Sequence, residues 1–185
     1  MHKNFLYIIM GLLLFLGGCD MSHNIKNFKN QTPAMDFQAY FTGPVKAWGM
    51  IQGPTGKINR RFTADLVGTW QGETGTLDEV FYFNDGEVME RAWEISRLSE
   101  NTYSATADDI VGTAYGESAG NATNWNYTMN LPVGDKTYKV AFDDWMFLME
   151  DGIVINKAKL KKFGLPVGEM TIFMKKGDTA TGAQE

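Results

Sequence analysis

From Phe37 onward the chain alternates short β-prone runs with breaks rich in Gly, Asn and Asp, and no stretch shows a convincing helical period. The strongest turn signals are Asn-Asp-Gly at 84–86 and Asp-Gly at 151–152, because Asp-Gly supplies the positive φ angles that a tight hairpin demands. Pro-Val-Gly-Asp at 132–135 is a third turn signal. Since consecutive hairpins form an antiparallel meander, the pattern predicts an all-β fold.

The β-prone runs are numerous enough to form a closed sheet. We expect about eight to ten strands, and closing them into one small antiparallel up-and-down barrel removes the exposed edges. A chain of 185 residues has room for one such domain and not for a second, so we place it at 37–176, followed by a disordered tail at 177–185. The expected strands are 45–52, 58–70, 78–83, 87–95, 103–107, 125–131, 136–149, 153–161 and 169–175.

Alternation along two runs predicts which side chains face the barrel interior. In one run Trp125, Tyr127, Met129 and Leu131 share a face, opposite polar residues at 124, 126, 128 and 130. The run 136–149 is less regular, because its apolar positions change parity between 142 and 145. We expect a β-bulge at 143–144 to absorb this change and to turn Trp145 toward the interior.

Arg91 has the same parity as Met89, Trp93 and Ile95, so we expect its guanidinium to point inward. A charge in that position needs a partner. The partner is either the carboxylate or phosphate of an otherwise apolar ligand, or the protein itself, through Asp109 or Asp143 or by stacking on Trp93. Burial of Arg91 without an acidic partner would favour the ligand.

The scarcity of His and Cys excludes several chemistries. Of the two histidines, His2 lies in the expected targeting segment and His23 in the expected linker, and Cys19 is the only cysteine. The folded domain therefore cannot build a Ser-His-Asp triad, a Cys-His pair, a haem ligated by histidine or an ordinary zinc site. We expect no metal site and no cofactor. A net charge of −5 without a long basic run also excludes nucleic acid as a partner.

Carboxylates are the main groups left for catalysis. The pairs at 108–109 and 143–144 can each present one carboxylate to a given face, because adjacent strand residues point in opposite directions. We assign no catalytic residue. An enzyme acting on lipid or glycan is kept as an alternative, and it requires two carboxylates that converge in one pocket. Its candidate residues are Glu79, Glu90, Asp109 and Asp143.

The N-terminal segment reads as a lipoprotein signal peptide over residues 1–18. Lys3 supplies the positive charge, residues 5–15 are apolar, and that run is too short to span a bilayer. Leu-Gly-Gly-Cys at 16–19 resembles a lipobox, which implies cleavage before Cys19 and a lipid on its sulfur. An ordinary signal peptide followed by a chance cysteine is the alternative.

Lipidation at Cys19 would make a membrane the first partner of this protein. Residues 19–36 are rich in Asn, Lys and Ser, which is typical of a tether between lipid and fold. The resulting location is the cell envelope, on the periplasmic side. By resemblance to enterobacterial lipoproteins, Asp20 favours the inner membrane, with the outer membrane as the alternative.

Motifs throughout the mature chain resemble those of a family of bacterial lipoproteins described as domain of unknown function 3833. The resemblance implies a calycin-like or lipocalin-like barrel. Genes of that family often lie beside genes for cyclopropane-type fatty-acid modification, which implies a role in envelope lipids. The motifs are Ala-Trp-Gly at 47–49, Arg-Phe at 61–62, Gly-Thr-Trp at 68–70, Leu-Asp-Glu at 77–79, Asp-Gly at 85–86, Arg-Ala-Trp at 91–93, Asp-Ile-Val-Gly at 109–112, Gly-Asn-Ala at 120–122 and Asp-Asp-Trp at 143–145.

Together the residues and the resemblance predict a barrel that binds a fatty-acyl or other hydrophobic molecule at a membrane. A barrel of about eight strands is just wide enough for one such ligand. A scaffold lipoprotein with a filled barrel is the alternative, and the sequence leaves the oligomeric state open. The residues expected to line or close the site are Arg91, Trp93, Trp125, Tyr127 and Trp145.

Overall fold

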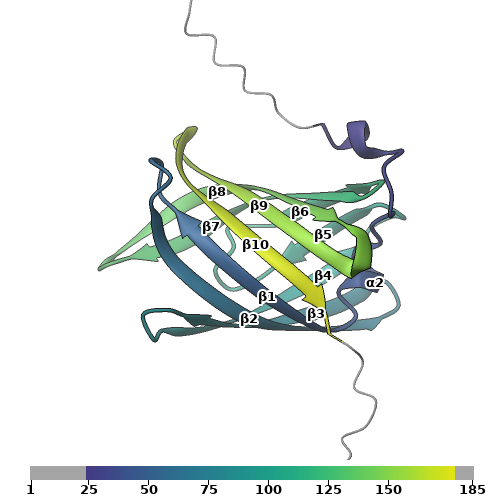
Figure 1. Cartoon of the computed structure of the whole chain (residues 1–185), viewed down its shortest axis with the longest axis horizontal. Coiled ribbons are helices and arrows are strands. Elements are labelled where there is room, and N and C mark those ends of the chain that lie inside the picture. Colours follow the sequence, from purple (N-terminus) through teal and green to yellow (C-terminus); the bar gives the residue numbers. More distant parts are fainter. Residues whose placement is uncertain (1–23, 178–185) are drawn as a thin grey trace, which may run out of the picture.

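The computed structural model describes residues 24–177, and within them ten antiparallel strands close into a single barrel (Figure 1). The expected signal peptide, Cys19 and residues 178–185 of the expected tail lie outside the described residues. Strand order follows chain order around the barrel, and β10 pairs with β1 to close it, so the all-β up-and-down barrel predicted from the sequence is confirmed. The strands are β1 (Gly43–Gln52), β2 (Ile58–Gln71), β3 (Thr74–Phe83), β4 (Val88–Arg97), β5 (Thr102–Thr106), β6 (Ala114–Ala119), β7 (Ala122–Val133), β8 (Lys136–Leu148), β9 (Ile153–Lys162) and β10 (Leu165–Lys176).

The expected turns join the expected strands. Gly86 has φ 90°, and Asp151 and Gly152 have φ 59° and 68°, which are the left-handed angles that Asp-Gly turns supply. Every strand has a hydrogen-bonded neighbour on both sides, so residues 24–177 contain a complete set of strand partners.

Strand β6 is the one strand that the sequence reading missed. Its sequence, AYGESA, contains a glycine and a glutamate and shows little β propensity. Gly116 is required there because the Trp125 ring packs against its backbone, and a Cβ at this position would come within 2.6 Å of that ring. Gly116 lowers the β propensity of this segment, but its contact with Trp125 on the neighbouring strand β7 explains why glycine is found there.

Strand β8 contains no bulge, and the expected change of phase at 143–144 is wrong. Its pairing with β7 runs without interruption from Ala122 opposite Phe147 to Val133 opposite Lys136. Asp144 therefore points into the barrel and Trp145 points out of it. The outward Trp145 is nonetheless buried, because Phe28 of the N-terminal segment lies 5.6 Å from its ring, centroid to centroid.

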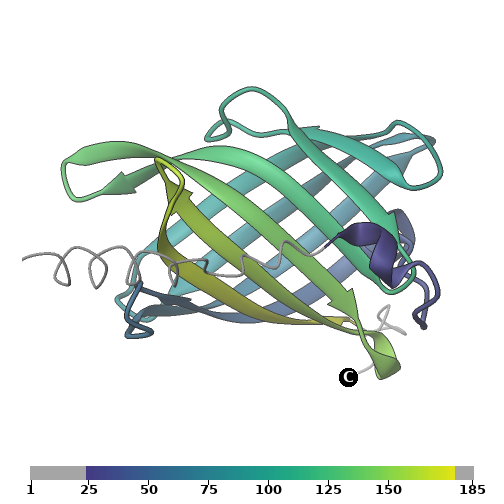
Figure 2. The ribbon, with the colours of Figure 1, turned by 90° about the horizontal axis from the view of Figure 1, so that it is seen from above.

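The described part of the segment expected to be a tether packs on the barrel. A short helical turn, η1 (Ile25–Phe28), lies against the outside of the wall near one end (Figure 2). Ile25 is buried in a cluster with Trp145, and the amide of buried Met35 donates to the carbonyl of Gly120 at 2.7 Å. The polar composition of this stretch had indicated a linker, but its few apolar side chains are enough to hold it against the wall.

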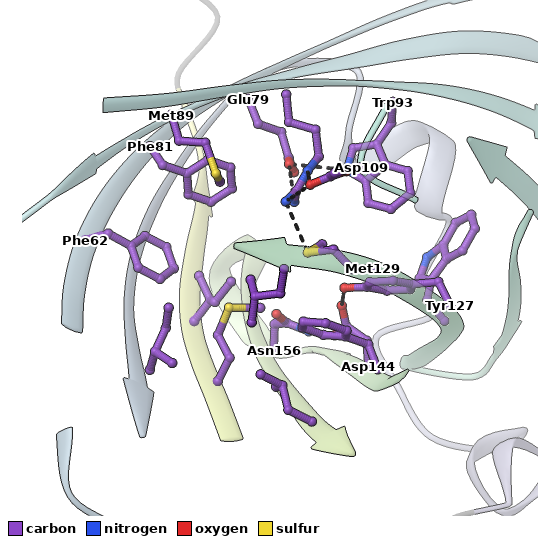
Figure 3. Close-up of a pocket in the computed structure, with 18 of the residues that line it drawn as sticks. Phe62, Glu79, Phe81, Met89, Trp93, Asp109, Tyr127, Met129, Asp144 and Asn156 are labelled. Carbon is purple, nitrogen blue, oxygen red and sulfur yellow. Dashed lines mark hydrogen bonds and ion pairs between the residues drawn. The ribbon is translucent and has the colours of Figure 1, made fainter. Parts of the chain in front are cut away.

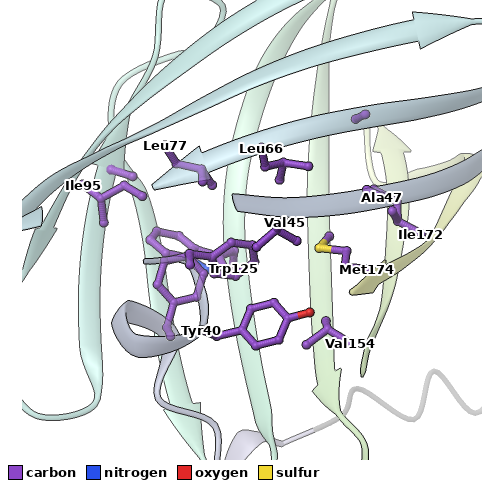
Figure 4. Packing of buried hydrophobic residues seen from close by; sticks show 14 of the residues in the cluster. Tyr40, Val45, Ala47, Leu66, Leu77, Ile95, Trp125, Val154, Ile172 and Met174 are labelled. Atoms are coloured by element: carbon purple, nitrogen blue, oxygen red, sulfur yellow. The ribbon is translucent and has the colours of Figure 1, made fainter. Parts of the chain in front are cut away.

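A helical turn, α2 (Phe37–Tyr40), closes one end of the barrel. Asp36 caps it by accepting a hydrogen bond from the amide of Ala39 at 3.0 Å. Phe37, Tyr40 and Phe41 are buried, and around them side chains such as Val45, Leu66, Val154 and Met174 form the main core (Figure 4). The core thus fills the capped end. We call the opposite end, which carries the turns after β1, β3, β7 and β9, the mouth.

The remaining helical piece is η2 (Glu150–Gly152), in the turn between β8 and β9. Within residues 24–177, none of the helices has the length and hydrophobicity needed to cross a membrane.

Candidate functional site

A cavity of about 450 Å³ occupies the barrel between the cap, which is formed by α2, and the mouth. Phe37 of the cap forms part of its lining at one end, and Glu87 and Gly134, in turns of the mouth, line it at the other. Most of the remaining lining comes from the inward positions of the strands and is apolar, including Phe62, Leu77 and a series of methionines (Figure 3). An apolar cavity of this size is typical of small-molecule binding sites.

One polar cluster in the cavity centres on Arg91. Its Nε and Nη2 donate to Oδ2 of Asp109 at 3.0 and 2.7 Å, and its Nη1 lies 3.5 Å from Oε2 of Glu79. Trp93 donates from Nε1 to the same Glu79 oxygen at 3.2 Å. The arginine and glutamate side chains are 12% and 11% exposed, so this is a largely buried ion-pair network.

The Arg91 cluster is held in place by strand pairing and by a loop that is hydrogen-bonded to β7. Glu79 on β3 lies directly opposite Arg91 on β4, so both side chains emerge on the inner face. Asp109 belongs to the loop between β5 and β6. That loop is held against β7, because the amide of Val111 donates to the carbonyl of Thr128 and the amide of Asn130 donates to the carbonyl of Asp109, both at 2.8 Å.

A second polar cluster surrounds Asp144 on β8. The Tyr127 hydroxyl donates to its Oδ2 at 3.0 Å, and the Asn156 side-chain amide donates to its Oδ1. The same amide group also donates to the carbonyl of Trp145 at 3.0 Å. Asp144 and Asn156 are buried, and each of these inward side chains also lines the cavity.

Burial perturbs the acid groups of both clusters. Burial raises the pKa of Glu79 to about 7, although the Arg91 charge and the Trp93 hydrogen bond partly oppose the shift. Burial also raises the pKa of Asp144 to about 6, against the hydrogen bonds from Asn156 and Tyr127. The pKa of the Tyr127 hydroxyl lies well above its ordinary value, first because it is buried and next because Asp144 is close.

Four of the five expected ligand-binding residues lie at the cavity, namely Arg91, Trp93, Trp125 and Tyr127. Trp145 does not, because β8 keeps its phase and places this ring on the outer face beneath η1. Arg91 points inward as expected, but Asp109 and Glu79 already pair with it. The internal ion pair foreseen as the alternative is therefore present.

The carboxylates proposed for an enzyme divide between the two faces of the wall. Glu79 and Asp109 line the cavity, whereas Glu90 is exposed and Asp143 accepts hydrogen bonds from Trp145 and Asn124 outside it. Sequence reasoning missed Asp144 and Asn156 as lining residues. Unbroken alternation from Val140 and Phe142 would have placed Asp144 inside.

The chemistry available in the cavity is that of carboxylates, two paired guanidinium groups, a phenol and an amide. Across residues 24–177, no group of three or more His, Cys, Asp or Glu side chains is arranged to hold a metal ion. The site can therefore present hydrogen-bonding and charged groups to a molecule whose remaining surface is apolar.

The barrel is similar to two solved structures of low sequence identity. One is the S-type phycobiliprotein lyase CPES from Guillardia theta, with a TM-score of 0.59, 7% identity, and coverage of 85% of this chain and 100% of that one. The other is Rv2717c from M. tuberculosis, with a TM-score of 0.58, 12% identity, and coverage of 80% and 100%. These likenesses show that the barrel fold is shared with both structures.

Sequence comparison adds one match. No curated protein is significantly similar in sequence to this chain. A family model described as "Protein of unknown function (DUF3833)" matches residues 13–176, which is the whole barrel and part of the segment before it.

Proposed function

The chain belongs to the DUF3833 family, whose function is unknown, and we propose that its barrel binds a hydrophobic, lipid-like molecule. The observation that carries this proposal is the cavity of about 450 Å³, apolar over most of its surface, that extends from the cap to the mouth. Burial of apolar ligand surface supplies about 25 cal/mol per Å², so a cavity of this kind favours an acyl chain or a similar molecule. The fold, shared with lipocalin-like barrels, supports the same function.

The scaffold alternative is less well supported. A purely structural barrel is expected to have its interior filled by side chains, because an empty apolar cavity costs stability. In this protein the main core fills the capped end and a second cluster of buried residues, including Val140 and Leu160, lies nearer the mouth, yet a cavity of about 450 Å³ remains in the barrel. The interior is thus better explained as a binding site than as incomplete packing.

A test of this function fills the cavity with a side chain. Ala105 on β5 lines the cavity, and its neighbour Thr106 is exposed on the outside. In residues 24–177, Ala105→Trp is expected to weaken binding of the neutral fluorophore N-phenyl-1-naphthylamine by about tenfold or more, which corresponds to about 1.4 kcal/mol. Fluorescence titration measures the affinity.

The matched control is Thr106→Trp, which adds the same ring on the other face of the same strand and should leave probe binding unchanged. Equal binding by Ala105→Trp and the unmodified chain would show that the probe does not enter the barrel. If the unmodified chain binds neither the fluorophore nor any lipid from a cell extract, the result would support the scaffold alternative.

We also propose that the barrel is held at a membrane of the cell envelope through a lipid on Cys19, after removal of residues 1–18. A charged segment, an apolar segment and a lipobox follow one another in the order typical of a lipoprotein signal peptide, which supports this proposal. Asp20 favours the inner membrane over the outer one. Labelled palmitate is expected to be incorporated into the full chain in a bacterial host, and Cys19→Ser should abolish the label. Label retained by Cys19→Ser would rule out this anchor.

A carboxylate-based enzyme acting on lipid or glycan is the second candidate. The observation in its favour is that Glu79, Asp109 and Asp144 converge on one cavity, and that the pKa values of Glu79 and Asp144 are raised toward neutrality. Against it, each of these carboxylates already interacts with side chains of the protein. A lipid ester recovered as its hydrolysis products after incubation would favour the enzyme, and recovery of the intact ester would favour binding.

A further inference from the structure

The hydrogen-bond donors in the Arg91 cluster are engaged within the protein. Each of the three guanidinium nitrogens of Arg91 faces a carboxylate, with Nε and Nη2 on Asp109 and Nη1 toward Glu79. The indole N–H of Trp93 donates to Glu79. An anionic head group could bind Arg91 only by displacing one of these two carboxylates, which would leave that carboxylate buried without its cation.

The donors of the second cluster are also engaged. The Tyr127 hydroxyl and the Asn156 amide both donate to Asp144, from two sides of that carboxylate. Around these two clusters the wall thus has three carboxylates, from Glu79, Asp109 and Asp144, for one guanidinium. The second guanidinium in the lining belongs to Arg60 at the mouth, where it pairs with Asp85 and Glu87. An incoming anion meets an excess of like charge in a site of low dielectric constant.

A hydrogen-bond acceptor is left over beside Arg91, whereas the buried donor left over among the lining residues, Nε of Arg60, lies at the mouth. Both hydrogen bonds from Arg91 to Asp109 go to its Oδ2, and the other oxygen, Oδ1, is buried with no hydrogen-bond partner among the described residues. Asp109 also lines the cavity and its side chain is 31% exposed, so a ligand in the cavity would contact this carboxylate group (Figure 3). A buried carboxylate oxygen without a donor is unfavourable, and a ligand that donates to it removes the penalty.

We propose that the polar end of the ligand is a hydrogen-bond donor, such as the ammonium or hydroxyl group of a long-chain amine or alcohol, and that it binds Asp109. This inference rests on the proposed function and specifies the class of ligand for the same cavity. It reverses the polarity of one of the two alternatives drawn from the sequence, the one in which Arg91 holds a carboxylate or phosphate of the ligand. The guanidinium of Arg91 instead orients Asp109 and balances part of its charge.

A series of twelve-carbon probes tests the proposal on residues 24–177 at pH 7.5, by displacement of N-phenyl-1-naphthylamine. Dodecylamine is expected to bind about tenfold more tightly than dodecanoate, with dodecanol between them. Dodecyltrimethylammonium has the positive charge but no N–H group, so it should bind more weakly than dodecylamine. Equal binding of the two cations would overturn the hydrogen bond to Asp109.

Variants at two adjacent aspartates locate the contact. Asp109→Asn should remove most of the preference for dodecylamine over dodecanoate, since the amide lacks the charge. Asp108→Asn is the matched control, because Asp108 is exposed and does not line the cavity, and it should keep the full preference. Should Asp109→Asn fail to fold, the probe series on the unmodified chain still decides the proposal.

The outcomes separate this inference from the proposed function. Tightest binding of dodecanoate would overturn the donor head group while leaving a hydrophobic ligand in place. Failure of every probe, with failure of the fluorophore itself to bind, would contradict the proposed function and this inference with it.

Discussion

Arg91→Met is expected to destabilise the barrel by about 3–5 kcal/mol at pH 8, which is the loss typical of removing one partner from a buried ion pair. The substitution keeps an unbranched side chain in the cavity but leaves Glu79 and Asp109 without the cation that both of them face. The loss should shrink as the pH falls below about 7, because Glu79 then becomes protonated. Urea unfolding of residues 24–177, followed by tryptophan fluorescence, measures the free energy of unfolding.

Two further variants show whether buried charge is the cause. Glu79→Gln added to Arg91→Met should recover part of the stability, because one of the two stranded carboxylates is then neutral. Lys46→Met is the surface control. It removes an ion pair to Asp65 whose side chains are 40% and 51% exposed, and it should cost at most about 1 kcal/mol. A similarly small loss for Arg91→Met would mean that the network contributes nothing beyond a surface pair.

Acidification from pH 7.5 to pH 5 is expected to stabilise the protein. The pKa of Glu79 is about 7 in the folded chain, above its ordinary value of 4.5, so the folded state binds more protons than the unfolded state between these pH values. The free energy of unfolding must then fall as the pH rises through this window. At about 1.4 kcal/mol per pKa unit, Glu79 alone accounts for about 3 kcal/mol. Asp144 acts in the same direction between its ordinary value of 3.8 and about 6.

The variants Glu79→Gln and Asp144→Asn identify the groups that cause this slope. Each replaces a titrating carboxyl with a neutral group of nearly the same shape, so each should flatten its own part of the stability curve. Urea midpoints at a series of pH values between 5 and 7.5 give the measurement. Stability that is constant or that increases with pH over this range would show that Glu79 is ionised at low cost in the folded protein.

The candidate site was predictable wherever the alternation of a strand is unbroken. Trp125 and Tyr127 were placed inside by parity alone, and so was Arg91, which no hydrophobicity argument would have put there. Trp145 was misplaced because the sequence offered two ways to bury an aromatic residue, and only the packing of Phe28 from the N-terminal segment shows which one the protein uses. The same error concealed Asp144 as an inward carboxylate.

The polarity of the site could not be read from the sequence. Arg91 and Glu79 are opposite one another on β4 and β3, and this follows from the hairpin register. Asp109, however, contacts the same guanidinium from a loop. Backbone hydrogen bonds to β7 hold this loop in place, and no local sequence pattern predicts them. Whether Arg91 is free for an anion or already neutralised depends on that loop, and therefore so does the class of ligand.

Local sequence patterns predicted most of the strands, their turns and the inward parity of most side chains, because a period of two and Asp-Gly turns are local properties of the backbone. They did not predict β6, the packing of residues 24–36, the cavity in the barrel or the partners of Arg91. These depend on contacts outside each segment, such as Gly116 with Trp125 of the neighbouring strand and, far apart in the chain, Phe28 with Trp145. The closed barrel brings such segments together, so what the interior can bind depends on the three-dimensional packing of the chain.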